Sequence, residues 1–192
     1  RIIIFMLAAL LVSANLSAAP TANLTTGVAR LSASAHSIDY GAEAHSQIYE
    51  AQYGINPNLG ASLEVARISD VDGRTYIGTL YFQRPFDISQ AGARLSTAGY
   101  AGITHLSVED NFDDSESNTG FTLGLIADYS ICPELTAYGR AGIAFLDETL
   151  WTLDAGIRYE VRPQWFLSLG YRDYEVGGSS LGGFLAGATY QF

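Results

Sequence analysis

The chain has 192 residues, enough for one domain of ordinary size. Its 20 acidic residues outnumber its 10 basic ones, and the net charge of −10 argues against nucleic acid as a partner. Cys132 is the single cysteine, which excludes an intrachain disulfide.

A short apolar run lies at residues 2–12, and small residues follow it. This order is typical of a secretory signal peptide. A transmembrane helix needs about 20 apolar residues, so the run is too short to be one. We therefore expect residues 1–19 to be a cleaved signal peptide and residues 20–192 to form the mature domain. The residues after which cleavage is expected are Ala18, Ala19 or Ala22.

Alternation of polar and apolar residues dominates the rest of the chain. Successive side chains of a strand point to opposite faces, so alternation indicates strands with one apolar face. Proline cannot donate to a ladder hydrogen bond, and Pro57, Pro85, Pro133 and Pro163 mark turns or strand ends. The pattern predicts ten strands, at residues 26–36, 45–55, 60–69, 74–84, 92–107, 119–131, 135–146, 150–162, 164–175 and 182–192.

The segment 150–162 shows the alternation best. One face is wholly apolar and carries Trp151 and Tyr159, while the other face carries Asp154 and Arg158. Eight residues of strand tilted by about 40° rise roughly 20 Å, close to the apolar band of a membrane barrel with its aromatic girdles. The same spacing of two aromatic residues recurs in two other segments, at Phe121 and Tyr129 and at Phe184 and Phe192.

This pattern predicts an all-β fold, a transmembrane antiparallel up-and-down β-barrel. Even strand number, tight turns at one end and longer polar loops at the other are typical of bacterial outer-membrane barrels. Ten strands fit best, and eight strands are the alternative if the segment before residue 45 is a tail. A soluble β-sandwich is the other interpretation of an alternating strand set.

Charged residues on the face opposite the apolar stripes are the candidate functional residues. Inside a narrow barrel these charges must be paired or hydrated, because an unpaired buried charge is costly. We predict an ion-pair network that fills the lumen; a charged constriction in a small pore is the alternative. The network comprises Arg30, Arg94, Arg140, Arg158 and Arg172 with Glu50, Glu64, Asp128, Asp154 and Glu160.

Other polar groups yield no defined site. The acidic segment from Glu109 to Glu116 lacks the ligand spacing of a calcium loop, and we interpret it as a solvated loop. His36 and His45 flank the first loop without the spacing of a defined metal site. We therefore predict no cofactor, no metal and no catalytic residue.

One pair of residues supports an enzymatic alternative. His105 and Ser107 share a strand face, and a Ser–His–acid group can perform acyl transfer. The pair resembles the His-x-Ser element of an outer-membrane lipid A deacylase. In that family an Asn usually follows the Ser, whereas Val108 follows here. The resemblance implies a lipid A-modifying outer-membrane hydrolase.

The C-terminal third resembles small outer-membrane β-barrel proteins of Gram-negative bacteria, including OmpA-like, opacity-type and YfaZ-like families. The residues that carry the resemblance are 137–142, 154–159, 169–174 and 185–192. The resemblance implies a location in the outer membrane, contact with outer-membrane lipid and lipopolysaccharide, and recognition by the barrel-assembly machinery through the strand that ends at Phe192.

These families cover adhesion, envelope integrity and small pores, so the resemblance supports a location more than a task. We expect a monomer with a structural or surface-exposed role in the envelope. A narrow porin for small solutes is the first alternative function, and the lipid A hydrolase is the second.

Overall fold

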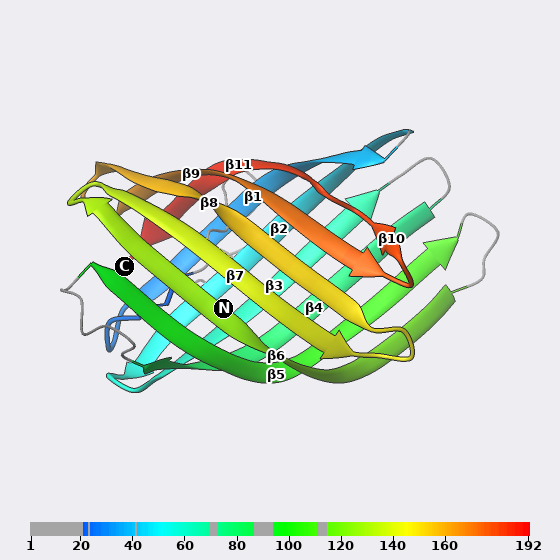
Figure 1. Ribbon diagram of the computed structural model, residues 1–192, viewed down its shortest axis with the longest axis horizontal. Coiled ribbons are helices and arrows are strands. Elements are labelled where there is room, and N and C mark those ends of the chain that lie inside the picture. Colours follow the sequence, from blue (N-terminus) through cyan, green and yellow to red (C-terminus); the bar gives the residue numbers. More distant parts are fainter. Residues whose placement is uncertain (1–20, 23, 41, 70–72, 87–93, 111–114) are drawn as a thin grey trace, which may run out of the picture.

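The computed structural model describes residues 21–22, 24–40, 42–69, 73–86, 94–110 and 115–192. These residues form a closed β-barrel whose strands are tilted against the long axis (Figure 1). Among them, no helix is long and apolar enough to span a membrane. The strands are β1 (Ala29–Tyr40), β2 (Ala42–Asn56), β3 (Leu59–Ser69), β4 (Gly73–Phe86), β5 (Leu95–Asp110), β6 (Ser115–Cys132), β7 (Leu135–Phe145), β8 (Leu150–Arg162), β9 (Trp165–Val176), β10 (Ser179–Ser180) and β11 (Gly183–Gln191).

Every neighbouring pair of strands in the barrel wall is antiparallel. Each strand from β1 to β8 pairs with the next, β8 pairs with β9, β9 pairs with β11, and β11 pairs with β1. The two-residue β10 adds a short ladder to the end of β9. The prediction of a ten-stranded up-and-down barrel is confirmed. The eight-stranded alternative is wrong, because β1 is hydrogen-bonded to β2 on one edge and to β11 on the other.

The predicted strand bounds are close to the observed ones, and β8 matches at both ends. Two differences have a structural reason. β1 begins at Ala29 instead of residue 26, because the chain before it turns into the barrel. β6 begins at Ser115, so Glu116 belongs to a strand, and Glu109 belongs to β5. The acidic loop is therefore shorter than predicted, and residues 111–114 lie outside the described residues.

The barrel has two distinct ends. We call the end with the β2–β3, β6–β7 and β8–β9 connections the turn end, and Phe192 lies there (Figure 1). The opposite end, with the β1–β2, β3–β4, β5–β6 and β7–β8 connections, is the loop end. The predicted signal peptide at residues 1–19 lies outside the described residues.

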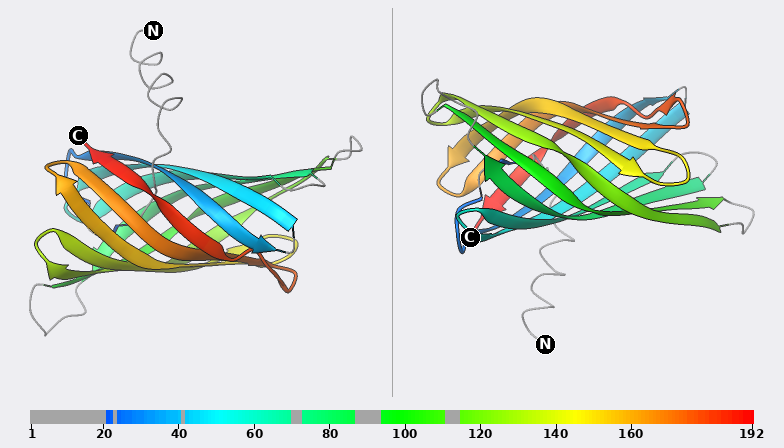
Figure 2. Two further views of the ribbon diagram at one scale, coloured as in Figure 1. Left: turned by 90° about the horizontal axis from the view of Figure 1, so that it is seen from above. Right: turned by 60° about the horizontal axis from the view of Figure 1, so that its bottom comes forward.

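The outer wall is apolar, as the stripes predict. Along β8, Trp151 and Ile157 are exposed while Asp154 and Arg158 are buried. Trp165, Tyr190 and Phe192 pack together at the turn end, with ring centroids 4.7 to 4.8 Å apart. A soluble sandwich is excluded, because the strands form a single closed sheet (Figure 2). The charged face of this sheet lies inside and the apolar face outside. The fold is that of a transmembrane β-barrel.

Residues just before β1 fold back into the lumen, and we call the described residues 21–22 and 24–28 the strap. Gly27 N donates to Gly54 O at 2.8 Å, and Gly54 N donates to Val28 O at 3.0 Å. Gly54 is required for this approach, because a Cβ there would lie 2.1 Å from the carbonyl oxygen of Thr25. The sequence pattern missed the strap, since three of its residues were assigned to the first strand.

Candidate functional site in the barrel lumen

Apolar side chains fill the lumen near the loop end. Ile48, Ala66 and Leu185 are completely buried, although they point to the inside of the barrel. These side chains pack against one another across the lumen and form an apolar layer. It consists of Ile38, Ile48, Ala66, Ile68, Ile77, Ala144, Leu150, Tyr174 and Leu185.

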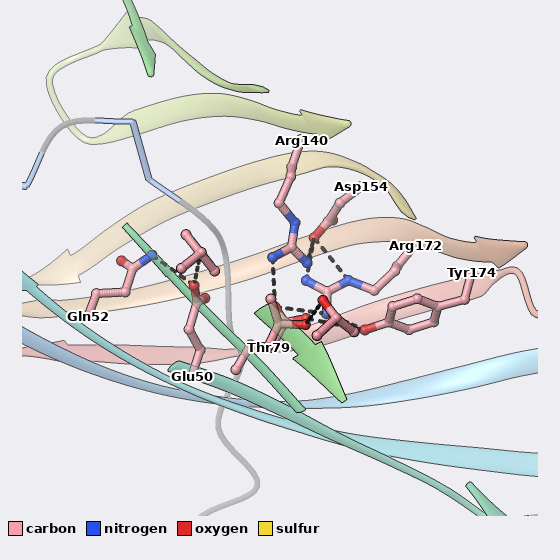
Figure 3. Close-up of polar contacts among 10 residues, drawn as sticks. Glu50, Gln52, Thr79, Arg140, Asp154, Arg172 and Tyr174 are labelled. Atoms are coloured by element: carbon pink, nitrogen blue, oxygen red, sulfur yellow. Dashed lines mark hydrogen bonds and ion pairs between the residues drawn. The ribbon is translucent and has the colours of Figure 1, made fainter. Parts of the chain in front are cut away.

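Four charged residues at mid-height form what we call the central cluster: Glu64, Arg140, Asp154 and Arg172 (Figure 3). Arg140 Nη1 lies 2.8 Å from Glu64 Oε2, and Arg140 Nη2 lies 3.5 Å from Asp154 Oδ2. Arg172 donates to Asp154 from Nε at 3.0 Å and also from Nη2. Its Nη1 lies 3.4 Å from Glu64 Oε2, so each arginine contacts both acids.

Tyrosines enclose the central cluster. Tyr174 accepts a hydrogen bond from Arg172 Nη1 at 3.1 Å and donates to Glu64 Oε1 at 3.4 Å. Tyr100 and Tyr138 lie flat against the wall at pairs of glycines. A Cβ at Gly142 would lie 1.9 Å from the Tyr100 hydroxyl oxygen, and one at Gly170 would lie 2.5 Å from that of Tyr138. The glycines therefore provide the space that lets large rings complete the filling.

The strap and a separate ion pair, between Arg158 and Asp128, occupy the lumen near the turn end. Asp128 Oδ2 accepts hydrogen bonds from Thr21 Oγ1 at 2.8 Å and Ala22 N at 2.9 Å, and it lies 3.4 Å from Arg158 Nη2. Gln83 Nε2 donates to the carbonyl oxygen of Thr21 at 2.8 Å. Ala22 is completely buried between Tyr81, Tyr100 and their neighbours. The strap is thus anchored to β6 through Asp128 and to β4 through Gln83.

The remaining predicted network residues differ in placement. Glu50 is buried in the lumen and accepts hydrogen bonds from Tyr81 and Gln52. Arg30 points to β11, where Nε donates to Gln191 Oε1 at 2.9 Å. Glu160 is half-buried near the turn end and forms no ion pair with the described residues.

Arg94 is a correction to the predicted set. The strand was expected to begin at residue 92, but β5 begins at Leu95, so Arg94 precedes the regular alternation. Its side chain is exposed, and its carbonyl oxygen accepts a hydrogen bond from Ser130 N at 2.8 Å. Arg94 therefore does not belong to the lumen network.

Little open space is found at mid-height. A cavity of about 20 Å³ lies beside Glu64, Arg140 and Tyr174, which is room for about one water molecule. Several buried polar atoms on β1, β2 and β3 have no hydrogen-bond partner among the described residues: Ser34 Oγ, His36 Nδ1, Ser46 Oγ, Glu50 Oε2 and Ser62 Oγ. These atoms give one wall of the lumen a polar character.

The histidines do not converge on a site. His36 is buried in the lumen, whereas His45 is exposed on the other face of the sheet. Within the described part of the chain, no three His, Cys, Asp or Glu side chains are grouped to hold a metal ion. His105 Nδ1 lies 2.7 Å from Thr119 Oγ1 on the outer face, and Ser107 shares that face.

Sequence reasoning found most charges but missed their surroundings. The strap contacts to Asp128 were not anticipated, because Thr21 and Ala22 lie before the first predicted strand and carry no alternation. Tyr100 and Tyr138 carried a usable signal: each is an aromatic residue on a lumen face opposite glycines of neighbouring strands. Aromatic rings on the charged face indicate a filled interior.

No protein-family model and no curated protein match the chain. Among solved structures, the N-terminal β-barrel domain of Pseudomonas aeruginosa OprF has a TM-score of 0.46 and 14% identity, covering 87% of this chain and 98% of its own. The NanC porin has a TM-score of 0.48 and 9% identity, covering 84% and 98%. A de novo designed transmembrane β-barrel has a TM-score of 0.47 and 15% identity, covering 88% and 99%. At such identities these structures assign no task to this chain.

Proposed function

We propose that this protein is an outer-membrane β-barrel with a structural or surface-exposed envelope role, and that its lumen does not conduct solutes. The observation that carries this proposal is that three groups of residues occupy the lumen along its length: the apolar layer, the central cluster and the strap. An ion that crosses the barrel would have to displace all three. Breaking a buried ion pair by removing one partner costs about 3–5 kcal/mol, so the central cluster alone is a substantial barrier.

The test is conductance of the purified full chain in planar lipid bilayers. We expect no steady unitary current steps, with a known porin inserted under the same conditions as the positive control. A variant that lacks residues 21–25 tests whether the rest of the lumen is closed without the strap. It should also fail to conduct, because the apolar layer and the central cluster are retained. Unitary steps from the wild-type chain would refute the proposal.

A narrow porin is the second candidate, and a specific observation favours it. The buried polar atoms of Ser34, Ser46 and Ser62 on neighbouring strands have no partner among the described residues. An unsatisfied buried group costs about 1–3 kcal/mol, so these atoms favour bound water along β1–β3. Steady current steps that disappear when Ser34 and Ser46 are both replaced by valine would support this candidate.

A lipid A-modifying hydrolase is the third candidate. His105 and Ser107 lie on the outer face, and the hydrogen bond of the imidazole goes to the neutral Thr119 instead of an acid. The absence of enzymatic activity stays a prediction, and lipid A analysis tests it. Lipid A from cells with the wild-type protein, His105→Ala or Ser107→Ala should have the same mass spectrum as lipid A from cells without the gene.

A location in the outer membrane would bring the protein into contact with two kinds of partner. Outer-membrane lipid and lipopolysaccharide would cover the apolar wall, and the barrel-assembly machinery would recognise the last strand. Phe192 is exposed beside Tyr190, and its N donates to Ala29 O at 2.8 Å, so it lies at the seam of β1 and β11. Deletion of Phe192 should lower the amount of heat-modifiable barrel in the outer membrane; an unchanged amount would refute this assignment. A single species of monomer mass in detergent would support the monomer.

A further inference from the structure

Glu50 is the exception among the buried acids of the lumen. Glu64, Asp128 and Asp154 each have an arginine nitrogen within 4 Å. Glu50 is equally deep, at 2% exposure, but forms no ion pair with any described residue. In Figure 3 it lies apart from the arginines and contacts Gln52.

The contacts of Glu50 all come from neutral groups and use one oxygen. Oε1 accepts hydrogen bonds from the Tyr81 hydroxyl at 2.7 Å and from Gln52 Nε2 at 2.9 Å. Oε2 is buried and has no hydrogen-bond partner among the described residues. The strand register places Glu64 directly opposite Glu50, so the nearest residue on β3 is another acid. This arrangement disfavours a negative charge on Glu50.

Among the described residues, each arginine of the lumen already contacts another group, and Arg158 lies 3.4 Å from Asp128 Oδ2. Arg140 and Arg172, from β7 and β9, are engaged by Glu64 and Asp154. Arg30 on β1 is a diagonal neighbour, since it pairs in register with Gln52. Its side chain points away, donates to Gln191 and lies 6.0 Å from the centre of the Phe166 ring.

We propose that Glu50 holds a proton in the folded barrel at neutral pH and is a proton-binding site that links the stability of the lumen to pH. An unpaired buried carboxylate is costly, whereas a neutral carboxyl group needs only hydrogen bonds. Loss of the proton would leave a charge that only water or a rotated Arg30 side chain could satisfy. The inference rests on the sealed lumen of the proposed function, because free water at Oε2 would stabilise the ionised form.

The test compares wild type with Glu50→Gln over a range of pH. Trp151 and Trp165 face outward and report urea unfolding from lipid vesicles by fluorescence. A glutamate in an unfolded chain loses its proton at about pH 4.3, so above that pH the folded wild type holds one proton more than the unfolded chain. The wild-type folding equilibrium constant, divided by that of Glu50→Gln, should fall tenfold per pH unit above about pH 5. A ratio that is flat or rises with pH overturns the proposal.

Glu64→Gln is the matched control, because Glu64 is the register partner of Glu50 and is equally buried. It should lose stability at pH 7, since Arg140 and Arg172 lose a charged partner, whereas Glu50→Gln should not. Infrared spectra of the folded wild type at pH 7 should contain the C=O stretch of a protonated carboxyl group, and this band should be absent from Glu50→Gln. A wild-type spectrum without that band overturns the proposal, even if the Glu50 variant fails to fold. Conductance of the wild type is measured separately, so a leaking lumen is distinguishable from an ionised Glu50.

Discussion

Replacement of Arg172 by methionine tests whether the lumen is a closed interior. Arg172 is completely buried, and its guanidinium group contacts Asp154, Glu64 and Tyr174. Methionine keeps the apolar stem and removes the charge. Asp154 then retains only Arg140 as a cation, at 3.5 Å. Removal of one partner from a buried pair costs about 3–5 kcal/mol, and we expect Arg172→Met to lower the free energy of unfolding by that amount.

Urea unfolding from lipid vesicles, followed by tryptophan fluorescence, measures this loss. Arg162→Met is the matched control, because Arg162 is exposed at the end of β8 and should change stability by less than about 0.5 kcal/mol. The double variant Arg172→Met with Asp154→Leu should recover part of the loss, since both partners of the closest pair are then apolar. A loss below about 1 kcal/mol for Arg172→Met would show that water solvates the cluster and would refute the closed interior.

Three further variants test other parts of the structure. Gly142→Ala should destabilise the barrel by about 1–3 kcal/mol, because the new Cβ would lie 1.9 Å from the Tyr100 hydroxyl oxygen. Adding Tyr100→Phe should restore part of the lost stability. Gly139→Ala is the control, because the atom nearest to its new Cβ would be 3.8 Å away. Gly54→Ala should release the strap and speed proteolysis of the segment before β1, whereas Gly78→Ala, with nothing within 4 Å, should not; equal rates would refute the role of Gly54. Leu125 lies on the outer wall, midway between Phe121 and Tyr129, and Leu125→Arg should lower the free energy of unfolding in vesicles by about 2–4 kcal/mol. Val161→Arg, near the turn end, should lower it by about 0–1 kcal/mol. Equal losses would contradict a hydrocarbon belt around the barrel.

The wall of the barrel could be predicted from sequence, because the alternation of one strand is a local property. Trp151, Asp154 and Arg158 reveal their faces without knowledge of any partner strand. Which charges meet is not local: Glu64 and Arg140 come from strands that are not neighbours, and only the closure of the barrel brings them within 2.8 Å. The prediction for Arg94 failed for a related reason, since β5 begins at Leu95, three residues later than predicted, and Arg94 lies before the regular alternation.

The strap was beyond sequence reasoning. Two of its anchors are hydrogen bonds from Thr21 and Ala22 to Asp128, more than 100 positions away. No periodicity records such a contact. The Tyr100 and Tyr138 rings could be predicted in part. The sequence pattern shows aromatic residues on the polar, inward face of a strand, but only the strand register shows which glycines they contact.

The strap also constrains how the molecule is built and labelled. It runs directly into β1, which forms the seam with β11, so the cylinder is completed around a piece of its own polypeptide. A reporter peptide fused in front of Thr21 would adjoin residues that are buried in the lumen. Residues 147–149, in the connection between β7 and β8, have exposed side chains and offer an insertion point away from the seam.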